Sequence, residues 1–301
     1  MSSVHTTAYQ RLVAVAAGLK VPAAVRRVAT EPPQDPRPGQ IWRAAWKDVI
    51  QPLLVTSTGD DTLRAVPASF ERYADGNTLL LPASASTLEE PLALWWGLEA
   101  TVPWCVLDRQ VSELSNCPAS LTRHSLAGAV AGAPRGASTA ESAAANEYRG
   151  LLAGRVAVLS AARWEPEGTG SLPQLLKDKA ITPGDLAAEL ELLPPQALAV
   201  WRGKLPLTPD QAATLADRLG QRAEQLIAAN PALPHEVVHE LNRPLRRAQV
   251  KALAARYNEA EHDARLRAAY GIFALAARQD GPARPNWTAR TDRYFELCLG
   301  E

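Results

Sequence analysis

The pattern of apolar and polar positions divides the chain into a strand-like part and a helical part. Short apolar runs separated by turn signals extend from Gln40 to about Leu114, and this spacing predicts a small, mostly antiparallel β-barrel. From about Asn146 onward, apolar residues recur at helical spacing. We therefore predict an α+β fold, with the β domain followed by helices. The predicted strands lie at Ile41–Trp42, Pro52–Thr56, Leu63–Pro67, Thr78–Leu81 and Trp104–Leu107.

Stretches rich in proline, glycine and small residues set the predicted domain boundaries. Proline interrupts helices because it lacks the backbone donor and restricts its neighbour. The predicted parts are an N-terminal helix and proline-rich lead (1–35), the barrel (36–114), an Ala/Ser/Gly linker (115–145), a helix and hinge (146–170), a five-helix segment (171–229) and a C-terminal helical extension (230–301).

Helix start and stop signals are dense between residues 171 and 229. Thr182 is a predicted N-cap followed by Pro183 at the first helical position, and Thr208-Pro209 repeats this arrangement. Gly203 and Gly220 supply the stops that glycine gives at helix C-termini. The segment therefore predicts four short helices and a fifth at 223–229.

Three stretches of this segment resemble the Xre/Cro repressor family of helix-turn-helix proteins. They are Leu-Ala-Ala-Glu-Leu at 186–190, Trp-Arg-Gly-Lys at 201–204 and Leu-Ala-Asp-Arg-Leu-Gly at 215–220. The resemblance covers about 55 residues and implies a helix-turn-helix domain whose third helix enters the major groove of double-stranded DNA. It also implies a homodimer on a two-fold site.

The resemblance places the DNA-reading helix at residues 194–201. Gln196 is the predicted base reader, and Arg202 and Lys204 are placed for phosphate or base contact. Trp201 occupies about the place of the acid that the family usually carries near the end of this helix. The alternative is a helix-turn-helix that serves as a protein-contact or dimer module.

The charge of the chain is balanced and gives no overall basic signal. There are 32 basic and 32 acidic residues, and residues 171–229 carry six basic and seven acidic side chains. A DNA-binding face must therefore come from local placement. Besides a basic N-terminal arm, the candidates for extra phosphate contacts are Arg243, Arg246, Arg247 and Lys251, which alternatively form a solvated face.

The predicted barrel resembles the MazF/PemK family of SH3-like barrels at residues 37–44, 52–57 and 65–69. That family includes RNA-cleaving toxins that use an Arg after the first strand and a Thr or Ser at the end of a later strand. Here that loop holds Lys47 and no Arg, while Ala68 and Ser69 lie near the place of the Thr. We expect a barrel kept for assembly or for a small effector or protein partner. The alternative is a toxin–antitoxin fusion with RNase activity.

His235-Glu236-Val237-Val238-His239 matches the His-Glu-x-x-His motif of zinc peptidases, with Glu259 as a candidate third ligand. Pro234 would start the helix at the motif, whereas the motif normally lies inside a helix. A continuous helix predicted from Pro244 to about residue 278 would also place Glu259 roughly 22 Å beyond the turn, against roughly 8 Å for His239 before it. We therefore predict no metal site and keep a zinc peptidase as the less favoured alternative.

These patterns together predict a non-enzymatic transcriptional regulator with no catalytic residues and no cofactor. The three cysteines are widely spaced and indicate neither disulfides nor a zinc ribbon, which favours the cytoplasm. No apolar run reaches the roughly 18–20 residues that a membrane-spanning helix needs.

Overall fold

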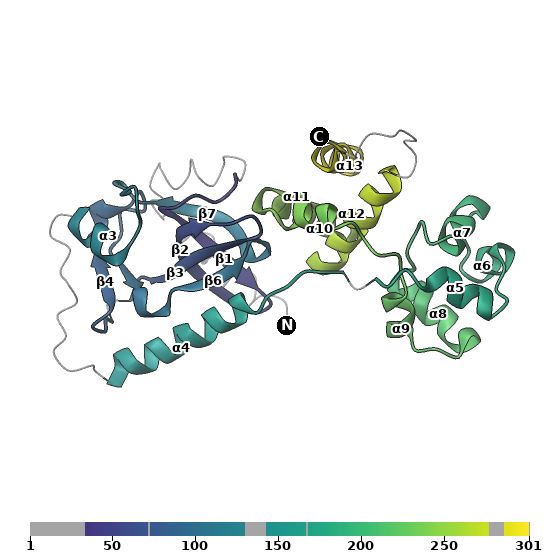
Figure 1. Cartoon of the computed structure of the whole chain (residues 1–301), viewed down its shortest axis with the longest axis horizontal. Helices are drawn as coiled ribbons and strands as arrows, with labels where there is room; N and C mark the ends of the chain where they lie inside the picture. The colour runs from purple at the N-terminus through teal and green to yellow at the C-terminus, as the bar shows by residue number, and fades with distance from the viewer. Residues whose placement is uncertain (1–33, 72, 130–142, 167, 277–285, 301) are drawn as a thin grey trace, which may run out of the picture. The chain divides into compact units, whose positions relative to one another are not determined.

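The computed structural model describes residues 34–71, 73–129, 143–166, 168–276 and 286–300 (Figure 1). The predicted N-terminal helix and part of the predicted linker lie outside these residues. The chain separates into two compact units, Met1–Ala162 and Arg163–Glu301. No described helix combines the length and apolar character needed to cross a bilayer.

The first unit is built on an antiparallel sheet, which confirms the predicted antiparallel β domain followed by helices. Six strands follow one another in the order β4-β5-β3-β2-β1-β7, and β6 pairs separately with β3. β4 and β7 end this path without pairing with each other, so the sheet is open. The strands are β1 (Gln40–Trp46), β2 (Val49–Thr58), β3 (Thr62–Ser69), β4 (Thr78–Leu81), β5 (Leu92–Trp95), β6 (Ala100–Pro103) and β7 (Leu107–Glu113).

The middle strands are apolar on both faces. Leu54 of β2 pairs with Val66 of β3, and both side chains are fully buried. Burial on both faces explains why these strands appear in the sequence as nearly continuous apolar runs instead of alternating ones. The connection between β4 and β5 is joined to the end of β7 by backbone hydrogen bonds, from Thr87 N–H to the Glu113 carbonyl and from Ser115 N–H to the Ala85 carbonyl.

In the described part of the first unit, two helices pack on the sheet. α3 (Arg123–Ala129) contributes Leu126, which has no exposed surface, to the core of the sheet. α4 (Ala143–Ser160) lies across the sheet against β1, β2 and β6 (Figure 1). Its Leu152 packs on Trp95, and its Arg155 donates a hydrogen bond to the buried Gln51 amide oxygen.

The second unit begins with five short helices around their own apolar core. Thr182 and Thr208 each accept a hydrogen bond from the backbone N–H three residues later, as the sequence predicts. Gly203 and Gly220 both have positive φ, a conformation that glycine adopts without steric cost. The helices are α5 (Leu172–Asp178), α6 (Pro183–Glu189), α7 (Pro194–Trp201), α8 (Pro209–Leu219) and α9 (Ala223–Ala228).

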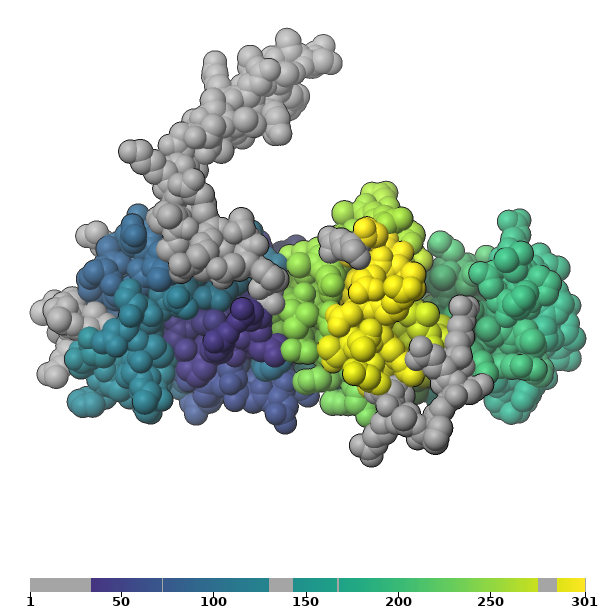
Figure 2. All heavy atoms as spheres, turned by 90° about the horizontal axis from the view of Figure 1, so that it is seen from above, coloured from purple at the N-terminus to yellow at the C-terminus, as the bar shows by residue number. Residues whose placement is uncertain are grey.

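Four further helices follow among the described residues, and α13 packs against α11 and α12 (Figures 1 and 2). Glu240 is nearly inaccessible and accepts a hydrogen bond from Arg246 Nε at 2.8 Å, while Arg246 also pairs with Asp292. These contacts connect three helices through charged groups that would be costly to bury alone. The helices are α10 (His235–Asn242), α11 (Pro244–Tyr257), α12 (Glu261–Ala276) and α13 (Trp287–Leu299).

The structure corrects several sequence predictions of local structure. Trp104–Val106 forms a 3-10 helix instead of a strand, and β5, β6 and the part of β7 after Leu107 were not predicted. The predicted linker contains α3, whose apolar Leu126 faces the core. The long helix expected from Pro244 breaks at Asn258, which adopts the left-handed conformation that ends α11. Asparagine tolerates this conformation better than most residues.

Glu240→Ala should destabilise the second unit by about 3–5 kcal/mol, because it leaves Arg246 buried without its main partner. Glu236→Ala on the same helix is the matched control, since Glu236 is exposed, and should change stability by less than about 0.5 kcal/mol. Urea unfolding followed by circular dichroism measures both. Equal stability of the two variants would contradict the structural role of the ion pair.

Candidate nucleic-acid interface

α6 and α7 lie in contact and are joined by the short turn at residues 190–193. Ala197 and Val200 of α7 are buried in the core of the five-helix segment, and the residues at its beginning are exposed. α7 therefore presents its first turn to solvent, while its other face holds it on α5 and α6.

Gln196 is exposed on this first turn, and part of its side chain is already engaged. Its amide oxygen accepts a hydrogen bond from the Leu193 backbone N–H at 3.1 Å, which caps α7. This contact orients the side chain and leaves the amide N–H groups as donors. Those groups match the acceptors that purines expose in the major groove.

Positive side chains gather at the other end of α7. Arg202 and Lys204 are exposed on either side of Gly203. Lys177 of α5 lies over the Trp201 ring, 5.3 Å from its centroid, and the Trp201 indole N–H donates to the Ile181 carbonyl at 2.8 Å. Lys177 was not predicted, because its contact with Trp201 depends on how α5 packs and leaves no sequence signal. The dipole of α7 also favours cations near its C-terminal end.

Arg218 of α8 is bound internally to α6. It forms ion pairs with Asp185, at 3.0 Å, and with Glu189. Hydrogen bonds from Thr182, and then from Arg218, lower the pKa of Asp185 to about 2. Arg218 therefore connects the N-terminal cap of α6 to α8. It also neutralises two of the acids close to the predicted DNA-reading helix.

The predicted basic cluster on α11 is not a surface cluster. Arg246 and Arg247 are 2% and 6% exposed, and Arg247 donates to Glu261 at 3.2 Å. Arg243 pairs with Glu240, and Lys251 is exposed. α11 packs between α10, α12 and α13, so it does not present its first turn to solvent. Arg246 and Arg247 are therefore too buried to contact phosphates, and we no longer assign them to the predicted interface.

The zinc-peptidase motif lies at the start of α10, because His235 is its first residue. Because α11 ends at Asn258, no continuous helix carries Glu259 away from the histidines as the sequence predicted. Glu259 is nonetheless engaged elsewhere, since it accepts two hydrogen bonds from Arg267 at 2.9 and 2.7 Å. No group of three candidate metal ligands occurs in the part of the chain that the structure describes.

Of the positions matched to the RNase family, Ser69 makes a structural contact and Lys47 lies in a tight turn. Ser69 is buried, and its hydroxyl accepts a hydrogen bond from the Trp95 indole N–H at 3.1 Å. Lys47 lies in the turn between β1 and β2 with a positive φ of 50°.

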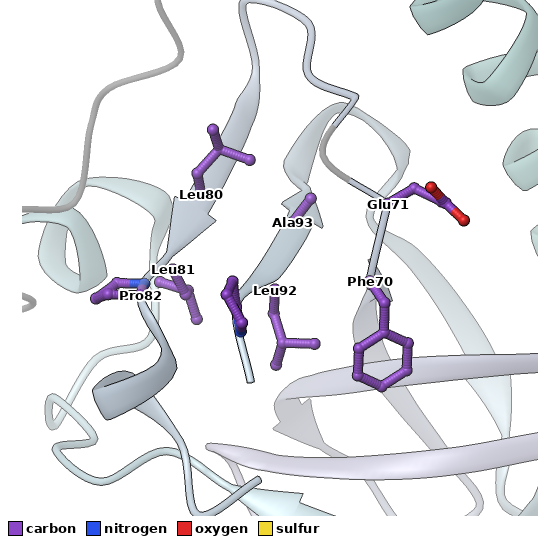
Figure 3. A pocket seen from close by; sticks show the side chains of 8 residues that line it. Phe70, Glu71, Leu80, Leu81, Pro82, Leu92 and Ala93 are labelled. Atoms are coloured by element: carbon purple, nitrogen blue, oxygen red, sulfur yellow. The ribbon is translucent and has the colours of Figure 1, made fainter. Parts of the chain in front are cut away.

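Beside the end of β3, Phe70 and the side chains of Leu80, Leu92 and Ala93 line an apolar hollow of about 280 Å³ (Figure 3).

Comparison with known proteins identifies no relative. No protein family, no curated protein and no solved structure matches the chain.

The pKa of Asp185 provides a test of the α6–α8 connection. Because the pKa in the folded chain lies below the value of about 3.9 for an unfolded chain, ionised Asp185 stabilises the fold above about pH 4. That contribution is lost as the pH falls through about 2. Titration of the Asp185 carboxyl carbon by NMR should show a midpoint near 2 that rises in Arg218→Ala. A midpoint that stays the same in Arg218→Ala would contradict the connection.

Proposed function

We propose that this chain is a non-enzymatic DNA-binding regulator of the Xre/Cro type, acting on double-stranded DNA as a homodimer. The observation that carries the proposal is the five-helix segment. In it α6 and α7 are joined by a short turn, and both predicted N-caps, Thr182 and Thr208, accept a backbone hydrogen bond. An exposed amide at one end of α7 and exposed cations at the other match base reading and phosphate contact.

In this proposal, α7 enters the major groove with its first turn toward the bases. Gln196 donates from its amide N–H groups to a base edge, and adenine is the base that glutamine pairs with best. Arg202, Lys204 and Lys177 neutralise phosphates beside the groove. Two copies would read half-sites about one helical turn, roughly 34 Å, apart.

The first unit is proposed to serve assembly or partner binding instead of catalysis. An SH3-like barrel remains our proposal for its finer classification, supported by the strongly paired β1–β2–β3 meander and the hydrogen bonds between the β4–β5 connection and the end of β7. The buried Ser69 hydroxyl and the absence of an Arg in the β1–β2 turn favour a binding role over RNA cleavage. A cytoplasmic location fits both units.

Salt-dependent retention on duplex DNA tests the proposal. The full chain should be retained on a mixed pool of DNA fragments at low salt and released as salt rises. In Arg202→Ala/Lys204→Ala, the slope of log K against log salt should fall by about 1.8, since each lost phosphate contact contributes roughly 0.9.

Arg222→Ala/Arg293→Ala is the control, because it removes the same net charge from two exposed positions on other elements, the N-cap of α9 and α13. The control should keep the slope of the unaltered chain. Equal losses in both double variants would assign retention to net charge instead of to this interface. Failure of the unaltered chain to bind duplex DNA at low salt would refute the proposed function.

Gln196→Ala should change sequence preference more than affinity. The substitution removes the base-reading amide while the phosphate cations remain, so selection from a random duplex pool should give a consensus that is degenerate at one position in each half-site. Sequencing of the selected duplexes measures the effect. An unchanged consensus would remove Gln196 from the base-reading role.

A further inference from the structure

A pocket of about 630 Å³ lies within the second unit, between the five-helix segment and the C-terminal helices. Its volume falls in the range of small-molecule sites, roughly 300–1,000 Å³. One wall comes from α7, the connection to α8 and the first turn of α8, and the other comes from α12 and α13. We call it the α8–α12 pocket.

The first wall is mainly apolar. Leu205, Pro206 and Pro209 line it, and they carry no charge that an apolar ligand body would have to displace. Gln196 lies on the same wall. The residue that we propose to read DNA bases is therefore within reach of anything bound in the pocket.

The second wall is aromatic. Tyr270 and Tyr294 line it, and the Tyr294 ring lies so close to Gly271 that a Cβ at this position would meet the ring at 2.1 Å. Tyr270 donates a hydrogen bond to the Pro231 carbonyl at 3.0 Å, which fixes α12 on the segment before α10. Burial raises the pKa of Tyr270 to about 12 and the pKa of Tyr294 further, so both phenols are neutral at pH 7.

The charge on the pocket walls is negative. Arg267 and Glu259 cancel each other through their two hydrogen bonds, and the Arg267 guanidinium also lies 4.6 Å from the centroid of the Tyr257 ring. Asp210 of α8 and Asp263 of α12 supply two more carboxylates, one from each wall. Within the described residues, neither carboxylate is engaged in an ion pair. The walls thus combine apolar and aromatic surface with two uncompensated negative charges.

We propose that the α8–α12 pocket binds a small organic cation, an amine with an apolar or aromatic body. The body would lie on the proline and tyrosine surfaces, and the ammonium group would be attracted by Asp210 and Asp263. A ligand seated here also competes with DNA for Gln196, so its binding weakens DNA binding. This regulatory consequence rests on the proposed function, whereas ligand binding itself does not.

Three probes with one indole body and different charge test the ligand class. Tryptamine is a cation at pH 7, tryptophol is neutral and indole-3-acetate is an anion. Isothermal titration of the full chain should give saturable binding of tryptamine, at least roughly tenfold tighter than binding of the other two probes. Asp210→Asn/Asp263→Asn should weaken tryptamine binding by roughly tenfold or more, which corresponds to about 1.4 kcal/mol.

Asp217→Asn is the matched control, because Asp217 is an exposed acid on α8 outside the pocket, and it should bind tryptamine like the unaltered chain. Equal binding of all three probes, unchanged binding in the double variant, or no binding of tryptamine at millimolar concentration would each overturn the proposal.

A separate measurement, DNA retention with and without tryptamine, tests the regulatory consequence. Loss of retention on adding tryptamine is expected, and full retention with tryptamine bound would overturn the competition. A chain that binds tryptamine but is never retained on DNA refutes the proposed function and leaves the pocket assignment intact.

Discussion

The arrangement of the five-helix segment depends on its buried apolar core, and a short polar network at the start of α6 adds to it. Thr182 and Asp185 cap each other reciprocally, and Arg218 reaches from α8 to the Asp185 carboxylate. An N-cap satisfies backbone donors that the helix itself cannot pair. Because Arg218 also binds Glu189, the same guanidinium holds both ends of α6 on α8. α7 is therefore presented on a fixed support.

This network has an electrostatic consequence for DNA binding. Arg218 is one of the six basic residues of the five-helix segment, and it is committed to neutralising acids of α6 instead of phosphates. Exposed positive charge remains near the C-terminal end of α7, at Arg202 and Lys204, and the other exposed cations of the segment are Lys177, Lys179 and Arg222. In the proposed complex, few phosphate contacts therefore supply the salt-dependent part of the DNA affinity. Dimerisation would raise the DNA affinity of such a protein, because two copies double the phosphate contacts.

The sequence predicts local structure well wherever a local physical rule sets it. The Thr182-Pro183 and Thr208-Pro209 caps and the glycine stops are such rules, and the structure confirms them. The inward orientation of Arg246 could not be predicted, because it depends on Glu240 and Asp292 from two other helices. The break at Asn258 and the contact of Lys177 with Trp201 likewise arise from tertiary packing. For the same reason, the α8–α12 pocket has no signature in the sequence.

Hydrogen–deuterium exchange of the full chain, with and without sheared duplex DNA at low salt, tests DNA recognition by α7 most directly. Exchange at residues 194–204 should slow when DNA is present, and exchange in α3 and β4 of the first unit should not change. Unchanged exchange at residues 194–204, together with slower exchange on the sheet, would contradict it.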